Sequence, residues 1–139
     1  MKCFACGITS PLVTEMRQIR IGRRAVRVED VFYRCPTCGE TFYTGEMADD
    51  TLRRATAAIR ARDGLLSPDE IISIRRRCGL TQAQMERLIG TGAKTFVRWE
   101  RGTIPQNRTA DTLLRVLREH PEVVAWLAEQ RRVRRQEAA

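Results

Sequence analysis

Two short matching stretches decide the fold of the first half of the chain, Cys3-Phe4-Ala5-Cys6-Gly7 and Cys35-Pro36-Thr37-Cys38-Gly39. In a Cys-x-x-Cys turn two thiolates can bind one cation, and the glycine that follows can take the positive φ that the tight turn requires. Two such turns supply the four sulfur ligands of a closed tetrahedral zinc site. We therefore predict one structural Zn2+ per chain. Its predicted ligands are Cys3, Cys6, Cys35 and Cys38.

Other chemistries for these cysteines fit the sequence less well. Disulfides are typical of secreted proteins, and no signal-peptide pattern follows Met1. A thioredoxin-like redox site needs one Cys-x-x-Cys beside a strand and a helix, whereas this chain has two copies. A catalytic zinc keeps an open position, which four thiolates would fill. Another metal or an iron–sulfur cluster stays open as an alternative. The fifth cysteine, Cys78, has no partner motif and is expected to be a small buried apolar residue.

Composition excludes several classes of protein. The chain has 139 residues, a formal charge of +8 and one histidine. No apolar run approaches the length of a membrane span, which predicts a soluble cytoplasmic protein without a membrane partner. No Ser/His/Asp set, Cys/His set or phosphate loop is present, so we do not predict an enzyme. Among the 25 basic residues only Lys2 and Lys94 are lysines, which singles out Lys94.

The stretch between the cysteine turns predicts a β-hairpin. Apolar and polar side chains alternate between Leu12 and Tyr33, and Gly22-Arg23-Arg24 marks a turn. A hairpin of this size is not stable alone, so the metal is expected to stabilise it. A helix is predicted from Thr44 to Arg62, and a short linker follows at Gly64 to Ser67. The first module is therefore predicted to span residues 1–64.

Residues 65–139 carry start and stop signals for five short helices. Capping boxes begin the first two, a glycine begins the third, an asparagine caps the fourth and a proline begins the fifth. These signals are Ser67-Pro68-Asp69-Glu70, Thr81-Gln82-Ala83-Gln84, Gly92 to Arg101, Asn107 and Pro121. The predicted fold class is therefore a two-module α+β protein. A small zinc-bound hairpin with one helix precedes an all-α domain of five helices.

The second and third helices have the spacing of a DNA-binding helix-turn-helix. Lys94 and Arg98 are four residues apart, which predicts that they lie on one face, one turn apart. An arginine can donate two hydrogen bonds to guanine. Phe96 and Trp99 are predicted to be buried instead. The alternative for Lys94 and Arg98 is an ordinary solvated face. Glu100 would repel phosphate, so we expect it to pair with an arginine of its own domain or to cap backbone groups.

The motifs of the helical half resemble the signature of the Cro/C1-type (XRE) family. They are Gly79-Leu80-Thr81-Gln82, Gly90 and Trp99-Glu100-Arg101-Gly102. Together with the two cysteine turns, the whole chain resembles MqsA-type antitoxins, which carry a YgiT-type zinc finger. The resemblance extends from Lys2 to about Leu127. It implies base contacts from the positions of Lys94 and Arg98. We expect asparagine at the first of these positions in the family, and this chain departs from that pattern.

The predicted DNA contacts comprise base readers, a short flanking side chain and phosphate contacts. They are Lys94, Arg98, Thr95, Gln82, Thr91 and Arg101. Helix-turn-helix proteins usually dimerise to read two half-sites. The expected two-fold surface comprises Leu117, Val124 and Leu127, which are alternatively ordinary core. The basic run from Arg131 to Arg135 is expected to be a solvated end, or else an additional attraction for phosphate.

The resemblance implies an antitoxin of a type II toxin–antitoxin system. Such a protein neutralises an mRNA-cleaving toxin through residues 1–64. It represses its own operon when residues 65–139 bind a palindromic operator. A free hairpin edge could add a strand to the toxin, and hairpin arginines could contact an acidic patch on it. These arginines are Arg20, Arg23, Arg24 and Arg27. The alternative is a stand-alone zinc-containing transcriptional regulator without a toxin partner.

Overall fold

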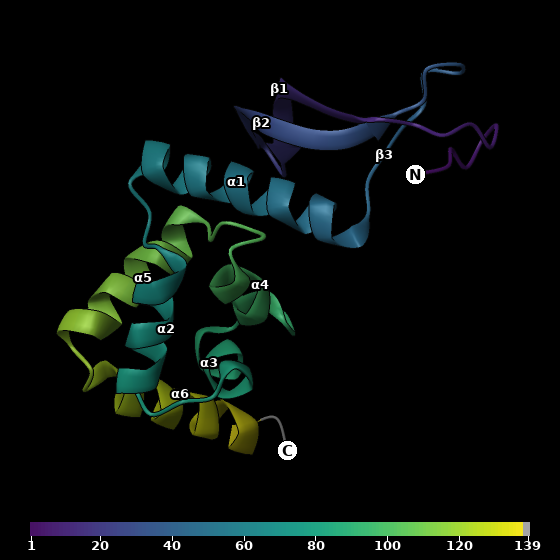
Figure 1. Cartoon of the computed structure of the whole chain (residues 1–139). Helices are drawn as coiled ribbons and strands as arrows, with labels where there is room; N and C mark the ends of the chain where they lie inside the picture. Colours follow the sequence, from purple (N-terminus) through teal and green to yellow (C-terminus); the bar gives the residue numbers. More distant parts are fainter. Residues whose placement is uncertain (138–139) are drawn as a thin grey trace. The chain divides into compact units, whose positions relative to one another are not determined.

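The computed structural model describes the backbone of residues 1–137 and the side chains of residues 1–131. The chain divides into two compact units, Met1–Arg62 and a second unit that begins at Asp63 (Figure 1). The first unit contains a β-sheet and one helix, and the described part of the second contains helices only. This arrangement agrees with the predicted α+β fold class. Among the described residues no helix is long and apolar enough to cross a membrane.

The first unit contains the predicted hairpin. Strand β1 (Leu12–Ile21) pairs antiparallel with β2 (Arg24–Arg34) around the turn at Gly22. A two-residue strand, β3 (Thr41–Phe42), then pairs with the end of β2, so that the strand order is β1-β2-β3. The sequence did not predict β3, because two residues are too few to show an alternating pattern. Helix α1 (Gly45–Asp63) follows.

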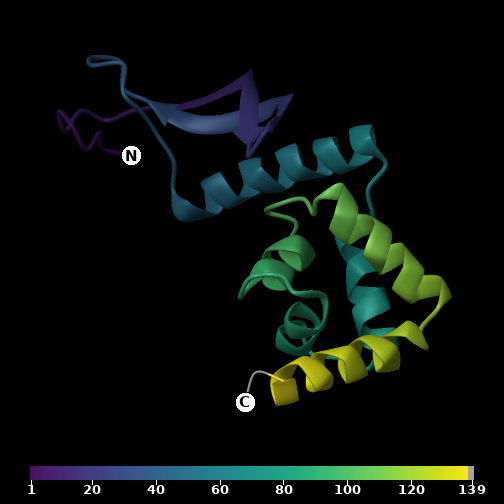
Figure 2. The same ribbon diagram turned by 180° about the vertical axis from the view of Figure 1, so that it is seen from behind.

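One face of the hairpin is buried and the other is exposed. On β2, Asp30 and Phe32 have no exposed surface, whereas Glu29 and Val31, which alternate with them, face the other side. Helix α1 lies along the buried face (Figures 1 and 2). Hydrogen bonds join the helix to β2: the Thr51 hydroxyl donates to Asp30 at 2.6 Å, Arg54 donates to the Glu29 carbonyl, and Arg62 donates to the Ala25 carbonyl. The alternation therefore decides which face the helix covers.

The second unit consists of five helices in its described residues. They are α2 (Pro68–Arg77), α3 (Gln82–Ile89), α4 (Thr95–Arg101), α5 (Arg108–Glu119) and α6 (Val123–Glu137). Both predicted capping boxes are present: Ser67 pairs reciprocally with Glu70 at the start of α2, and Thr81 with Gln84 at the start of α3. Asn107 caps α5 through a 2.7 Å hydrogen bond from the Ala110 N–H.

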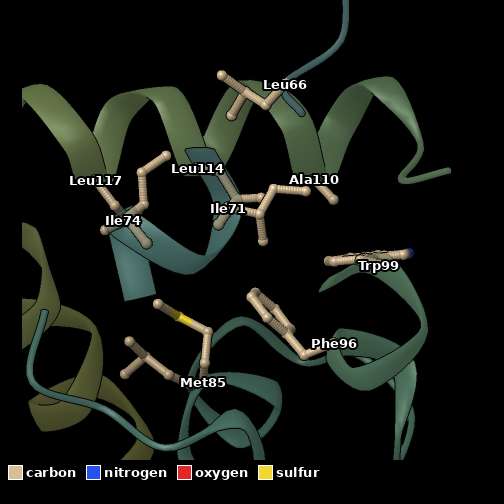
Figure 3. Close-up of a cluster of buried hydrophobic side chains, with 10 residues drawn as sticks. Leu66, Ile71, Ile74, Met85, Phe96, Trp99, Ala110, Leu114 and Leu117 are labelled. Carbon is tan, nitrogen blue, oxygen red and sulfur yellow. The ribbon is translucent and has the colours of Figure 1, made fainter. Parts of the chain in front are cut away.

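The core of the second unit lies where α2, α3, α4 and α5 meet (Figure 3). Its members are the apolar residues that face inward from each helix. The fully or nearly fully buried ones are Leu66, Ile71, Ile74, Met85, Leu88, Phe96, Trp99, Ala110, Leu114 and Leu117. Phe96 and Trp99 are buried, as predicted, and their ring centroids are 5.0 Å apart. Both aromatic residues of α4 therefore hold that helix against the rest of the unit.

Three expectations from the sequence need correction. Helix α4 begins at Thr95 rather than Gly92, because residues 92–94 form a turn. Helix α6 begins at Val123, since Pro121 lies in a turn closed by the bond from the Val124 N–H. Leu117, expected on a two-fold surface, is 1% exposed and belongs to the core. The alternative role given to it, ordinary core, is the one observed.

Helix α5 holds the segment that follows α1. The Asp111 carboxylate accepts a 2.8 Å hydrogen bond from the Leu66 N–H and a second from Arg115 Nε. Arg115 also donates to the Gly64 carbonyl, and Arg108 to the Asp63 carbonyl. The predicted linker is therefore fastened to α5 at both Gly64 and Leu66.

Candidate metal centre and helix-turn-helix surface

The four predicted ligands converge. The Sγ atoms of Cys3, Cys6, Cys35 and Cys38 all lie within 4.8 Å of one another. Sulfur–sulfur distances are 3.6 Å for Cys3–Cys38, 3.4 Å for Cys6–Cys35 and 3.8 Å for Cys6–Cys38. A tetrahedral zinc with bonds of about 2.3 Å places its sulfurs about 3.8 Å apart. The residues present therefore fit a four-thiolate metal site.

The two cysteine turns have the same backbone structure. In each, the glycine N–H donates to the carbonyl of the first cysteine, at 2.9 Å for Gly7 and 3.0 Å for Gly39. Both glycines have a φ of +75°. In each turn the first cysteine is buried and the second is exposed. The repeated Cys-x-x-Cys-Gly sequence thus produces two equivalent halves of one site. One half precedes the hairpin in the sequence and the other follows it.

The backbone favours the thiolate of one ligand, Cys35, whereas hydrogen bonds with neighbouring thiols and burial leave the pKa values of Cys6 and Cys38 raised. The Cys38 N–H is the main cause that lowers the pKa of the Cys35 thiol to about 6; burial opposes this, and the Thr37 N–H adds to it. Because a metal ligand must be deprotonated, a lowered thiol pKa assists binding near neutral pH. When bound, the metal would close the loop between residues 6 and 35 and stabilise the hairpin.

A buried polar network that sequence reasoning missed supports the hairpin. Asp30 accepts from the Thr51 hydroxyl and the Tyr43 hydroxyl, each at 2.6 Å, and from Arg17 at 3.3 Å. Burial, with the hydrogen bond to Asp30, raises the pKa of Tyr43 to about 12, so the phenol keeps its proton. Arg17 also lies over the Phe32 ring, 4.5 Å from its centroid. Asp30 interrupts the apolar pattern of β2, and that interruption was the available signal.

In the second unit, the start of α4 differs from the expected geometry. Lys94 is the helix N-cap and has a left-handed backbone, with φ of +62° and ψ of +8°. Its side chain therefore projects from a turn, one residue before the helix, and not from a regular helical face. The backbone of the two residues remains linked, because the Arg98 N–H donates to the Lys94 carbonyl at 3.3 Å. The expected stacking of Lys94 and Arg98 on a single helical face is thus only partly realised.

The other residues predicted at the start of α4 and at its end are accessible. Arg98 and Arg101 are exposed, and Thr95 is half-buried. The side chains of Lys94, Arg98 and Arg101 make no hydrogen bond or ion pair with any other described residue. Lys94, Arg98 and Arg101, three cations of the segment 94–101, therefore have no partner in the part of the chain whose side chains are described.

Gln82 and Thr91 are placed differently from these cations. The Gln82 amide donates to Glu100 Oε2, and the same carboxylate pairs with Arg75 Nε at 2.5 Å. The prediction that Glu100 pairs with an arginine of its own domain is confirmed. The Thr91 hydroxyl oxygen is buried, and in the described part of the chain it has no hydrogen-bond partner. Neither side chain is freely presented to solvent.

Two further groups of residues were singled out by the sequence. On the hairpin, Arg20, Arg23 and Arg27 are exposed and have no partner among the described residues, whereas Arg24 is half-buried and does interact. Arg131 is exposed, and the side chains of the remaining basic run, from position 132 onward, lie outside the described residues. Cys78 is half-buried and packs against the core, and burial raises the pKa of its thiol.

Comparisons with known proteins agree with this arrangement. The family described as the antitoxin component of a bacterial toxin–antitoxin system, MqsA, matches residues 1–129. Antitoxin MqsA of Escherichia coli strain K12 is 28% identical over 130 residues, which cover 89% of this chain and 97% of that protein. Antitoxin HigA-2 of Vibrio cholerae serotype O1 is 39% identical over 64 residues, 46% of this chain and 62% of that protein. The chain therefore belongs to the MqsA family of antitoxins from bacterial toxin–antitoxin systems.

Proposed function

We propose that this antitoxin neutralises an mRNA-cleaving toxin through its cysteine-rich unit and represses its own operon through the helical unit. The observation that carries the DNA-binding half is the pair of exposed cations, Lys94 just before α4 and Arg98 within it, which have no partner among the described residues. Phe96 and Trp99 anchor the same helix in the core. A rigid helix with free cations at its N-terminal end is how helix-turn-helix proteins read bases in the major groove.

Each predicted contact has a distinct role in this proposal. Arg98 reads a guanine by two hydrogen bonds, and Lys94 contacts an adjacent base or phosphate from the turn before the helix. Thr95 is short enough to permit close approach, and Arg101 attracts phosphate. Gln82 contacts phosphate only if its amide leaves Glu100, so its contribution to affinity should be smaller than that of Arg101.

A palindromic operator requires a homodimer. Because Leu117 is in the core, the two-fold surface must use other residues of the last two helices. Val116 and Trp126 are the exposed large apolar side chains there, at 40% and 59%. Val124 and Leu127 are half-buried against the core, so that they could contribute only at the margin of such a surface. We assign dimerisation to the outer sides of α5 and α6.

In the first unit, a bound Zn2+ would act as a structural staple that keeps the hairpin in its binding-competent shape. Four sulfurs within 4.8 Å support this role. We assign the toxin contact to this unit, because the family resemblance implies that the first unit binds the toxin and the second binds DNA. Nothing in this role requires the antitoxin to catalyse a reaction.

The DNA-binding half is tested with the region upstream of the antitoxin's own gene. Arg98→Ala should relax sequence preference at one base pair in each half-site, at a cost of about 1–3 kcal/mol per bidentate contact. Arg53→Ala, an exposed arginine of the other unit, is the matched control and should leave binding unchanged. Footprinting and competition with point-substituted operators measure the result. An Arg98→Ala protein with unaltered sequence preference would remove Arg98 from base reading.

The toxin half is tested by expressing the product of the adjacent reading frame. That product should arrest growth and cleave mRNA when expressed alone, and co-expression of the antitoxin should abolish both effects. The two proteins should co-purify. If the adjacent product is harmless and does not bind, a stand-alone zinc-containing regulator becomes the better description.

A further inference from the structure

The outer face of the hairpin, opposite α1, carries an unusual set of residues at the end nearest the cysteines. Leu12 lies opposite Tyr33, Thr14 opposite Val31, and Met16 opposite Glu29 in the β1–β2 register. Since side chains alternate along a strand, all six point away from the face that holds Asp30 and Phe32. We call this set, together with Phe4, the metal-end face.

The apolar members of the metal-end face are strongly exposed. Leu12 is 57% exposed and Met16 54%, whereas Phe32 on the opposite face has no exposed surface. Phe4, inside the first cysteine turn, is 79% exposed. Scattered single apolar residues are normal on a surface, but contiguous ones mark interaction sites. The question is therefore whether these residues are contiguous.

Ring contacts and strand pairing connect Phe4 with the apolar residues of the strands. Phe4 packs edge-on against Phe42 with centroids 5.4 Å apart, and Phe42 stacks on Tyr33, also at 5.4 Å. Tyr33 is the cross-strand partner of Leu12. The ring contacts Phe4–Phe42–Tyr33 and the strand pair Tyr33–Leu12 thus join the cysteine turn to the strands, with the buried Phe42 ring beneath the exposed Phe4 and Leu12.

The far end of the same face is basic. Arg20 and Arg27 point outward from β1 and β2, and Arg23 lies in the turn between the strands. None of these three guanidinium groups pairs with a described residue. Of the outward-facing residues on both strands, Glu29 is the only carboxylate. Face-to-face pairing with the same surface of a second copy would therefore bring like charges together, and a different, acidic protein is the better occupant.

We propose that the metal-end face and the three arginines Arg20, Arg23 and Arg27 form the docking surface for the cognate toxin. The complementary surface on that toxin is an apolar patch bordered by carboxylates. This inference rests on the proposed neutralising role of the first unit and specifies which side of it binds. Leu12 and Met16 act as the buried anchors of the contact, and the arginines steer association.

The test uses the product of the adjacent reading frame, purified separately, and a titration that yields Kd. Leu12→Ser/Met16→Ser should weaken binding about 30-fold or more, as expected when two interface anchors are truncated. Asp49→Ser/Arg53→Ser is the matched control, because it alters two exposed side chains of α1, which lies along the opposite face of the hairpin. The control should stay within about threefold of the wild type. Bound metal and operator affinity are measured on each variant to verify folding.

A second variant keeps the proposal testable if the serine variant does not fold. Arg20→Gln/Arg27→Gln alters exposed side chains without partners, so folding should be unaffected. It should slow association about tenfold at low salt and flatten the salt dependence of the rate. If the wild type binds the toxin and both double variants bind equally well, the docking surface is elsewhere. If the wild type itself does not bind, the neutralising function fails instead.

Discussion

Lys94 is the one non-glycine residue with positive φ in the described chain. A left-handed backbone costs an L-residue about 1–2 kcal/mol relative to glycine, and asparagine tolerates it better than lysine does. The strain lies at the start of α4, beside the residues proposed to read DNA. Strain at such a position is consistent with a side chain retained for function rather than stability.

Replacement of Lys94 by glycine should therefore separate stability from DNA binding. We expect Lys94→Gly to raise the free energy of unfolding of the helical unit by ~1 kcal/mol, because the strain is removed. Operator affinity should fall, since one cation is lost. Chemical denaturation and operator titration measure the two effects. Ala93→Gly, in the same turn, is the control and should not stabilise. A stability decrease in Lys94→Gly would show that the left-handed backbone is not strained.

At the scale of elements, buried polar groups hold the helices of the second unit together. Arg75 of α2 pairs with Glu100 of α4, and Gln82 of α3 donates to the same carboxylate. One carboxylate thus links three helices, α2, α3 and α4. Asp111 of α5 serves the linker in a similar way.

Asp111 makes the helical unit sensitive to acid. Burial raises the pKa of Asp111, but hydrogen bonds from the Leu66 N–H, Arg115 and Gln106 outweigh it and hold the pKa below its usual 3.8. A carboxyl whose folded pKa is lowered stabilises the fold above the unfolded value. That contribution is lost as the pH falls from about 3.8 through the folded pKa.

The variant Asp111→Asn should therefore lose about 2 kcal/mol of stability at neutral pH, as expected for hydrogen bonds to a charged group. The difference from the wild type should shrink as the pH falls below about 4. Tryptophan fluorescence during denaturation reports this unit, because Trp99 and Trp126 both lie in it. Asp49→Asn, in the first unit, is the control. A difference that stays constant with pH would contradict the role given to Asp111.

For the whole molecule, the two units should respond differently to loss of metal. The first has a hairpin and one helix around a small core, so its stability depends on the cysteine site. The second has its own apolar core and contains none of the four ligands. A chelator should therefore unfold the first unit and spare the helices of the second.

This outcome can be read from two signals. Metal analysis should give one zinc per chain before chelation. Addition of a chelator should reduce the strand contribution to circular dichroism, while tryptophan fluorescence keeps its native value, since neither tryptophan is in the first unit. Cys6→Ser should reproduce the effect without chelator. Loss of native fluorescence on chelation would mean that the helical unit also needs the metal.

Local signals in the sequence determined much of this protein. The two Cys-x-x-Cys-Gly turns, the alternation of the hairpin, both capping boxes and the burial of Phe96 and Trp99 follow from residue spacing, because each depends on neighbours a few positions away. Tertiary structure decided the rest. The left-handed backbone of Lys94 and the hydrogen bond from Gln82 to Glu100 are tertiary features. So are the burial of Leu117 and the exposure of the metal-end face. These features depend on which distant residues meet, and spacing along a chain carries no such information.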